Sequence, residues 1–218
     1  MKLLPIFPLK MVVFPGEKVN LNIFESRYKQ LINECLKEGK TFGIPFYNKD
    51  RLMPIMAEIE LLEISKVYAD GKLDVKTRAK NNVVKIVELH KTLPDKLYSA
   101  ATVEALEYDF DDSDLVLAMK VQEQMRILYE LLNINKEIPS LEELRVFDFG
   151  HLFGFSPMKE FQLLTIQTES DRQKFVLKHL DSFIPTTREM QELQHKAKLN
   201  GHFKDILPPD FKLSDFMK

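Results

Sequence analysis

Hydrophobic residues follow two different periods, and the change falls near residues 108–114. In the first half, residues 19–23 alternate apolar and polar, which is the period of a strand with one buried face. Further apolar runs predict strands at 3–7, 11–14, 56–68, 73–77, 83–89 and 98–106. Asp70-Gly71 separates two of them and is typical of a hairpin, because glycine accepts the positive φ of the turn. Short strands joined by tight turns predict a barrel or a sandwich.

One helix interrupts these strands. Five residues with helical spacing form a single apolar face: Tyr28, Leu31, Ile32, Cys35 and Leu36. We expect Ser26 to cap the start of this helix and Gly39 to end it in the left-handed conformation. Cys35 lies on the apolar face, and we therefore interpret it as a buried structural thiol.

The second half has the helical period. Residues 115–133 are apolar and contain neither glycine nor proline, which predicts a long helix capped by Asp114. Ser140-Leu141-Glu142-Glu143 matches a capping box, and Ser156-Pro157 offers a cap followed by proline at the first helical position. We expect one further helix from about 168 to 183 and a last one from Pro185 to about 200, which gives a helical bundle.

Composition narrows the classes of function. The chain has 218 residues, of which 44% are hydrophobic and 29% charged, as in ordinary globular proteins. A net charge of -2 provides no general positive field, which disfavours nucleic acid and anionic lipid as partners. The single cysteine fits a reducing compartment. No stretch resembles a transmembrane helix or a signal peptide, so we expect a cytoplasmic protein that does not contact a membrane.

The motifs of common catalytic and cofactor sites are missing. None of the seven glycines forms a phosphate-binding loop, and we interpret Gly150 to Gly154 as a helix interruption. There is no H-E-x-x-H, C-x-x-C or G-x-S-x-G motif, and we interpret the five histidines as solvated or capping. The sequence therefore predicts no catalytic, metal-binding or cofactor-binding residue. An enzyme of another type would need a concave pocket with converging polar groups.

A basic stretch leaves an alternative open. Lys76, Arg78 and Lys80 alternate along a predicted strand and would share one face. Such a row is able to follow a phosphate backbone, but the solvated outer face of a sheet has the same pattern and is the simpler interpretation. RNA binding through this face stays open as an alternative function.

Several motifs resemble one known family. The chain reads FPL at 7–9, VFPG at 13–16 and LNIFESRY at 21–28, with FGI at 42–44 and DGKL at 70–73. This series resembles the N-terminal domain of the Lon ATP-dependent proteases, most closely its stand-alone bacterial form. The chain departs from the family pattern at Met56-Ala57 and Arg78-Ala79, where the family usually has a glycine. It also lacks the Walker A motif of a complete Lon protease.

The resemblance implies an α+β fold, with an N-terminal PUA-like β pseudo-barrel that has one inserted helix, followed by a C-terminal α-helical bundle. We place the β domain at 1–110, the bundle at 111–205 and a C-terminal tail at 206–218. The family motif supplies residues with an expected structural role at a turn and at a strand-to-helix corner: Pro15, Gly16, Phe24, Glu25, Arg27 and Tyr28.

The resemblance also implies a function. A Lon N-terminal domain recognises protein substrates, so we expect a non-catalytic module that binds unfolded or specific polypeptides. PUA-like relatives elsewhere bind RNA, which is the competing function. Phe153, Phe155 and Met158 cluster around a helix break and are our candidate peptide-binding residues. The apolar tail that follows Gly201 is expected to dock on the body of the protein or on a partner.

Overall fold

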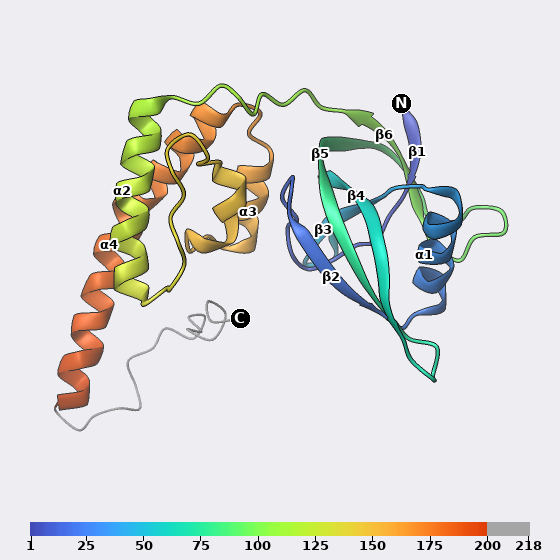
Figure 1. The fold of residues 1–218 in the computed structure, drawn as a ribbon, viewed down its shortest axis with the longest axis horizontal. Helices are drawn as coiled ribbons and strands as arrows, with labels where there is room; N and C mark the ends of the chain where they lie inside the picture. The colour runs from blue at the N-terminus through green and yellow to red at the C-terminus, as the bar shows by residue number, and fades with distance from the viewer. Residues whose placement is uncertain (200–218) are drawn as a thin grey trace. The chain divides into compact units, whose positions relative to one another are not determined.

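The structure is a computed structural model, and it describes residues 1–199. Its contacts form two compact units (Figure 1). The N-terminal unit combines Met1–Asp109 with Ser156–Gln167, and the second unit combines Phe110–Phe155 with the chain from Thr168 onward. The chain thus leaves the N-terminal unit near residue 110 and returns to it once, between residues 156 and 167. The single boundary predicted near residue 110 does not include this return. The tail predicted at 206–218 lies outside the described residues.

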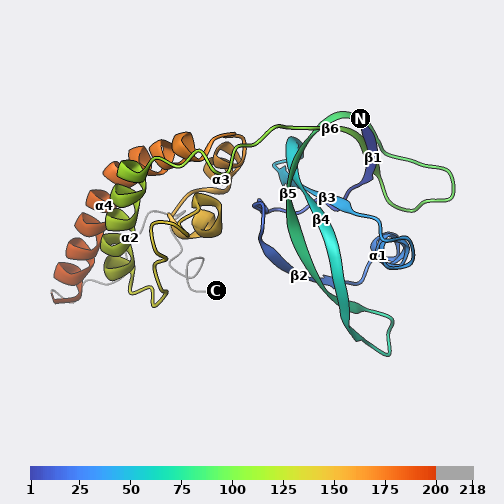
Figure 2. The same ribbon diagram turned by 45° about the horizontal axis from the view of Figure 1, so that its top comes forward.

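The N-terminal unit is built on a six-stranded antiparallel sheet. The strands are β1 (Lys2–Pro5), β2 (Lys18–Ile23), β3 (Phe42–Asn48), β4 (Arg51–Val67), β5 (Leu73–His90) and β6 (Ala100–Ala105). Their order is β1-β6-β5-β4-β3, and β2 pairs with the first part of β5. Figure 2 shows β2, β5 and β4 side by side, with α1 beside them in end view. The predicted mixture of a sheet and C-terminal helices is confirmed.

The central strands are longer than predicted. Separate strands were predicted at 73–77 and 83–89, but β5 runs continuously through Asn81 and Asn82, because residues on both sides of this pair are paired with β4. Asn82 also donates a hydrogen bond to the buried carboxylate of Glu58. The periodic pattern did not predict β3, which contains Pro45, a residue that weakens the sequence signal of a strand.

The predicted strand at 11–14 is wrong. The segment is largely buried but forms no ladder, and the amide of Phe14 donates to the carboxylate of Glu17, 2.9 Å away. Just before it, the chain makes isolated parallel bridges to β3, from Ile6 to Gly43 and from Leu9 to Phe46. These bridges provide partners for the outer edge of β3.

Helix α1 (Ser26–Glu38) turns its predicted face into the core. Tyr28, Leu31, Ile32 and Cys35 are buried, whereas Leu36 is exposed. The capping residue is Glu25 and not Ser26, and its side chain makes no capping hydrogen bond. Gly39 ends the helix in the left-handed conformation, as predicted.

The thiol of Cys35 is buried, as expected. Burial raises its pKa to about 11, which keeps it protonated and unreactive at neutral pH.

The returning segment carries α3 (Pro157–Leu164). Ser156 caps it by accepting a hydrogen bond from the amide of Lys159, and Pro157 occupies the first turn, as predicted. The hydroxyl of Tyr108 donates to the carbonyl of Leu164, and the ring of Phe161 lies 6.3 Å from that of Phe46. These contacts tie α3 to the N-terminal unit.

The second unit contains α2 (Leu115–Leu132), the 3-10 helix η1 (Val146–Leu152) and α4 (Glu169–Leu199). Asp114 caps α2 as predicted. The capping box at 140–143 does not start a helix, because the hydroxyl of Ser140 donates to the carboxylate of Glu143 instead. Pro185 does not start a new helix and lies inside α4. The hydroxyls of Thr186 and Thr187 bond to carbonyls one turn earlier, beside the position where proline removes a bond.

The middle of the second unit holds polar groups that the sequence did not predict. Glu169 and Arg172 form a buried ion pair, and His179 is buried between the rings of Phe155 and Phe183. The expectation that all five histidines are solvated or capping is wrong for His179. Its apolar surroundings and its 3.0 Å contact with a carbonyl oxygen, that of Phe153, account for the burial.

Candidate functional site

The PG turn near the start of the chain shapes the entry into β2. The amide of Glu17 donates to the carbonyl of Phe14, and Gly16 has a φ of 83°. Proline followed by a glycine with positive φ is the pattern of a type II turn. Gly16 and Glu17 both bond to Ala79 of β5, so a bulge follows the turn directly. Pro15 and Gly16 therefore have the geometry of a structural turn.

The corner between β2 and α1 holds the charged part of the family motif. Arg27 donates through Nε to the carboxylate of Glu25 at 2.8 Å, and its Nη2 lies 2.7 Å from the same oxygen. The carbonyl of Glu25 accepts the amides of Tyr28 and Lys29, which opens the helix. Phe24 is exposed, so its side chain does not contribute to the core. The pair is local and partly solvated, which limits its contribution to stability.

Tyr28 joins this corner to the core. Its ring is 4.0 Å from that of Phe7, and the guanidinium of Arg27 lies over it at 4.5 Å. Only 8% of the residue is exposed, yet its hydroxyl has no hydrogen-bond partner among residues 1–199. Burial raises the pKa of Tyr28, an effect that Arg27 opposes and Glu25 supports. The hydroxyl therefore stays protonated and is able to donate a hydrogen bond at neutral pH.

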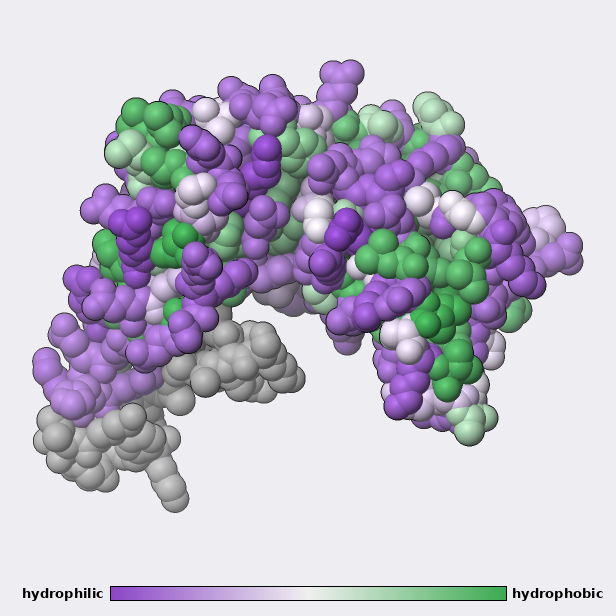
Figure 3. Space-filling model, viewed as in Figure 1, coloured by the Kyte–Doolittle hydropathy of each residue, from purple (hydrophilic) through white to green (hydrophobic). Residues whose placement is uncertain are grey.

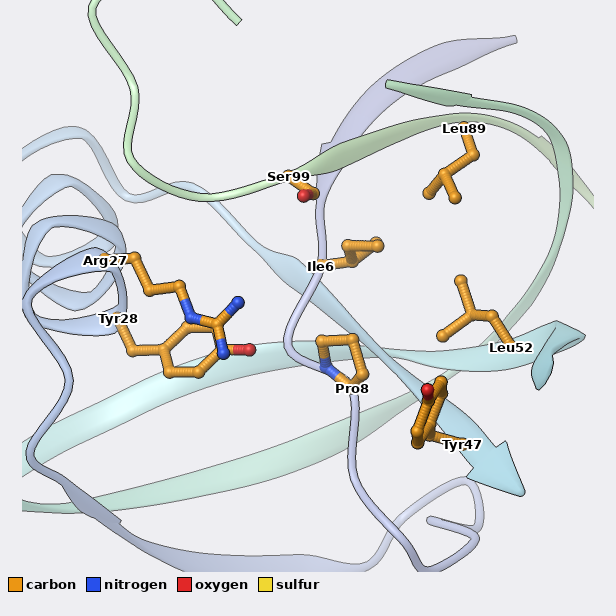
Figure 4. Close-up of a pocket in the computed structure, with 8 residues that line it drawn as sticks. All are labelled: Ile6, Pro8, Arg27, Tyr28, Tyr47, Leu52, Leu89 and Ser99. Carbon is orange, nitrogen blue, oxygen red and sulfur yellow. The ribbon is translucent and has the colours of Figure 1, made fainter. Parts of the chain in front are cut away.

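A pocket of about 410 Å³ lies next to Tyr28 in the N-terminal unit. Four apolar residues line part of it: Ile6, Pro8, Leu52 and Leu89. Ile6 belongs to a buried apolar cluster, and Leu52 packs against the same cluster. Figure 4 shows Leu52 and Leu89 on the side of the pocket opposite Arg27 and Tyr28. The volume lies within the usual range for a ligand site, about 300–1,000 Å³.

The remaining lining residues are polar: Arg27, Tyr28, Tyr47 and Ser99. Ser99 donates to the carbonyl of Lys91, and the hydroxyl of Tyr47 makes a long contact, 3.3 Å, with the carboxylate of Asp50. Arg27 is the single charged residue of the lining, and Glu25 neutralises it. Figure 4 shows Tyr47 beside Leu52, so the four polar residues do not form one wall. The pocket combines a side that carries Leu52 and Leu89 with an opposite side where Arg27, neutralised by Glu25, lies next to Tyr28.

The residues predicted to bind peptide lie elsewhere. Phe153 is fully buried and Phe155 is 93% buried, and their rings pack against each other at 5.8 Å in the second unit. Their prediction as surface residues is wrong, because Gly154 and the aromatic side chains of α4 enclose this segment. Met158 is exposed and belongs to the N-terminal unit. The three residues therefore do not form one exposed patch.

The exposed apolar residues are spread over several elements. They include Leu36 on α1, Leu62 and Val67 on β4, and Leu115 and Met119 on α2. On the face that it draws, Figure 3 shows one broad hydrophobic area over the N-terminal unit and smaller ones elsewhere, separated by hydrophilic residues. Exposed apolar residues are normal for a protein surface, so such an area does not by itself identify a binding site.

The basic face has the geometry predicted for it but not a clear positive charge. Lys76, Arg78 and Lys80 are exposed and alternate with buried residues of β5. Glu63 forms an ion pair with Lys76 at 2.6 Å, and Glu60 is paired with Arg78 in the sheet register. Acidic residues of β4 thus offset much of the charge of this face.

Within residues 1–199, no group of three or more His, Cys, Asp and Glu side chains is placed to hold a metal ion. None of the helices that the structure describes is long and apolar enough to cross a bilayer.

The sequence did not predict that the residues lining the pocket lie together. Arg27 and Tyr28 were predicted to be structural residues of the family motif, and Pro8 belongs to the FPL motif at 7–9. Tyr47, Leu52, Leu89 and Ser99 carried no signal, because each is an ordinary residue of a strand or loop. They meet only through the pairing of strands that are distant in the sequence.

Comparison with known proteins gives a consistent result. Residues 3–182 match the family model of the ATP-dependent protease La (LON) substrate-binding domain. No curated protein matches the sequence. A Lon N-terminal domain protein from Xanthomonas campestris is similar in structure, with a TM-score of 0.62 and 20% identity over 82% of this chain and 98% of its own.

The N-terminal domain of a Mycobacterium avium complex Lon protease is also similar. Its TM-score is 0.65, with 13% identity over 84% of this chain and 100% of the other. At these identities the two structures support the fold alone. The family match spans most of the sequence. The chain therefore belongs to the Lon substrate-binding domain family.

Proposed function

We propose that this protein is a non-catalytic module that recognises polypeptides, either unfolded chains or a specific protein partner. The observation that carries the proposal is the family match over residues 3–182, because the matched model describes a substrate-binding domain and not an ATPase or a peptidase. The neutral, half-apolar pocket of the N-terminal unit supports it, since uncharged pockets of this kind suit apolar segments of polypeptides.

We also propose that the sheet is a PUA-like pseudo-barrel. The parallel bridges that join Ile6 and Leu9 to β3 support this interpretation, because they bring the chain after β1 to the opposite end of the strand order. A barrel of this kind would place the pocket residues of β3, β4 and β5 around one opening.

RNA binding remains the competing function, and the acidic residues beside the basic face argue against it. A positive surface that binds RNA needs an excess of cations, whereas Lys76 is already paired with Glu63. An enzyme would need converging reactive groups. In the pocket of the N-terminal unit, the ionisable side chains are one arginine and two tyrosines, which is a poor set for acid-base chemistry at neutral pH.

The proposal is tested by measuring binding of a permanently unfolded protein, reduced and carboxymethylated α-lactalbumin, to the full chain by fluorescence anisotropy. We expect saturable binding that changes little between about 50 and 200 mM salt, because apolar contacts are screened less than ionic ones. Absence of binding to this protein and to a set of unfolded peptides would contradict the proposal. Tight, salt-sensitive binding of single-stranded RNA would favour the alternative.

A further inference from the structure

The hydroxyl of Tyr28 is an available donor in the wall of the pocket. The ring of Tyr28 packs against Phe7, but its hydroxyl is not enclosed, because among residues 1–199 the hydroxyl of Tyr129 is the one buried side-chain atom without a hydrogen-bond partner. The hydroxyl of Tyr28 makes no hydrogen bond within the described part of the chain, so it is able to donate to water or to a ligand in the pocket. Figure 4 shows the hydroxyl end of Tyr28 directed into the pocket.

A second donor lies next to this hydroxyl. The Nε and Nη2 atoms of Arg27 are held by Glu25, whereas Nη1 has no hydrogen-bond partner among residues 1–199. The guanidinium lies over the ring of Tyr28 at 4.5 Å, which keeps the two donors on the same wall. Because Glu25 already neutralises Arg27, this wall suits a neutral acceptor such as a carbonyl better than a second carboxylate.

The side of the pocket opposite these two donors determines which kind of side chain a ligand needs. Leu52 and Leu89 face this pair across the pocket, and Ile6 and Pro8 lie between them (Figure 4). Leu89 is 39% exposed, so the mouth of the pocket is open to solvent and a chain is able to enter without rearrangement. Filling about 410 Å³ would displace roughly a dozen waters at ~30 Å³ each. An uncharged apolar side chain is the group that gains most from this displacement.

We propose that this pocket binds one uncharged apolar residue of an extended polypeptide. The side chain packs against Leu52 and Leu89, and a neighbouring main-chain carbonyl accepts hydrogen bonds from Tyr28 and Arg27. This inference rests on the proposed function. It adds the site of binding and the class of residue that the site binds. A polypeptide residue fits because it carries an apolar group and a carbonyl at a short, fixed spacing.

The test uses the full chain and fluorescein-labelled Gly/Ser dodecapeptides with a central Phe-Leu, Asp-Asp or Lys-Lys pair. Anisotropy titrations are expected to show the Phe-Leu peptide binding at least about tenfold more tightly than either charged peptide, because burial of an unpaired charge is unfavourable. Equal binding of all three peptides would overturn the proposal.

Two pairs of variants locate the binding. Tyr28→Phe keeps the ring against Phe7 and removes the hydroxyl, and we expect the affinity for the Phe-Leu peptide to fall about 3- to 10-fold, as for a lost neutral hydrogen bond. Tyr68→Phe removes a half-buried tyrosine hydroxyl that donates to Asp74 in the β4–β5 hairpin, and it should leave the affinity unchanged because Tyr68 does not line the pocket. Loss of affinity in both variants, or in neither, would overturn the role of the hydroxyl.

The second pair tests the apolar wall. Leu89→Asp places a charge at the mouth of the pocket and should lower the affinity more than tenfold. Leu62→Asp makes the same change at an exposed leucine of β4 that does not line the pocket, and should bind as the unchanged protein does. Circular dichroism of all four variants confirms that each is folded.

The outcomes separate this inference from the proposed function. If unfolded α-lactalbumin binds the unchanged protein, Tyr28→Phe and Leu89→Asp equally well, the function stands and the pocket is not its site. If it binds none of them, the proposed function fails first. If the pocket holds a second copy of this chain, Leu89→Asp weakens self-association in sedimentation experiments and leaves peptide binding unchanged, which also overturns the inference.

Discussion

The N-terminal unit buries a single carboxylate, Glu58, whose partners come from three other segments, whereas the second unit buries an ion pair within one turn of α4. Glu58 accepts hydrogen bonds from Lys2, Thr41 and Asn82, which belong to β1, the segment before β3, and β5. The buried carboxylate is therefore made tolerable by one partly exposed cation and two neutral donors that come from distant parts of the sheet.

The second unit uses a local arrangement. Arg172 donates to Glu169 at 2.7 Å, and both side chains are at least 98% buried. The guanidinium lies over the rings of Phe110 and Phe147, and the other carboxylate oxygen of Glu169 accepts the amide of Val146. The pair thus fastens the start of α4 to the start of η1. The comparison shows that the same need, a satisfied buried charge, can be met by distant strands or by one helical turn.

The largest effect is expected from breaking the ion pair of the second unit. Arg172→Leu leaves the carboxylate of Glu169 buried without its cation, which should lower the free energy of unfolding by about 3–5 kcal/mol. Lys174→Ala is the matched control, because it breaks an exposed pair with Asp171 at the same spacing on α4 and should cost under about 1 kcal/mol. Urea unfolding measures both, and equal losses would show that burial does not distinguish the two pairs.

Two glycines extend the comparison to packing. Gly154 of the second unit has a φ of 72°, and an added Cβ would overlap the ring of Phe183. Gly154→Ala should destabilise by roughly 3 kcal/mol, because left-handed strain and overpacking act together.

Gly43 of the N-terminal unit lacks that strain. A Cβ there would lie 2.5 Å from the sulfur of Met56, which belongs to a flexible side chain. Gly43→Ala should therefore cost only about 1–2 kcal/mol. A larger loss for Gly43→Ala than for Gly154→Ala, measured by thermal unfolding, would contradict this account.

Several strands and helices were predictable from the sequence, and others were not. Alternation gave β2, and apolar runs gave most of β4 and β6. The cap residues gave the starts of α2 and α3, and the apolar stretch gave the end of α2 closely. The continuity of β5 and the existence of β3 were missed, because strand pairing decided them against local signals at Asn81-Asn82 and Pro45. The departure at Met56 has a partner in Gly43, where the small residue leaves room for the thioether.

The candidate site was less predictable than the fold. The family motif pointed to Arg27 and Tyr28, yet their exposure to a pocket depends on Leu52, Leu89 and Ser99, which reach it through tertiary contacts. Phe153 and Phe155 were predicted to be exposed at a helix break, but both are buried. Aromatic residues give the same sequence pattern in either case. Only the packing of α4 distinguished the two.

Acid should act on the N-terminal unit through Glu58. Burial alone would raise its pKa, but the hydrogen bonds from Lys2, Thr41 and Asn82 outweigh this and lower it. The resulting stabilisation is complete above the unfolded pKa of glutamate, about 4.3, and is lost as the pH falls through the lower folded value. Glu58→Gln should flatten the fall of unfolding free energy in that range.

The control for this prediction is Glu63→Gln, which changes an exposed carboxylate on the same strand. We expect it to leave the acid dependence close to that of the unchanged protein. Urea unfolding at a series of pH values gives both profiles. If Glu58→Gln has the same slope as the unchanged protein, the buried carboxylate does not carry the acid sensitivity of the sheet.

The smallest effects concern one tyrosine in each unit. The hydroxyls of Tyr28 and Tyr129 both lack a partner among residues 1–199, but that of Tyr28 lines a pocket, whereas that of Tyr129 is enclosed and burial raises its pKa to about 12. Tyr129→Phe should therefore raise the free energy of unfolding by about 1 kcal/mol, because it removes an unsatisfied buried group. Tyr28→Phe should change it by less than about 0.5 kcal/mol, since the hydroxyl of Tyr28 is not among the enclosed unsatisfied groups of residues 1–199. Equal stabilisation by the two substitutions in thermal unfolding would mean that the hydroxyl of Tyr28 is as dry as that of Tyr129, and the pocket would then not be open to a ligand.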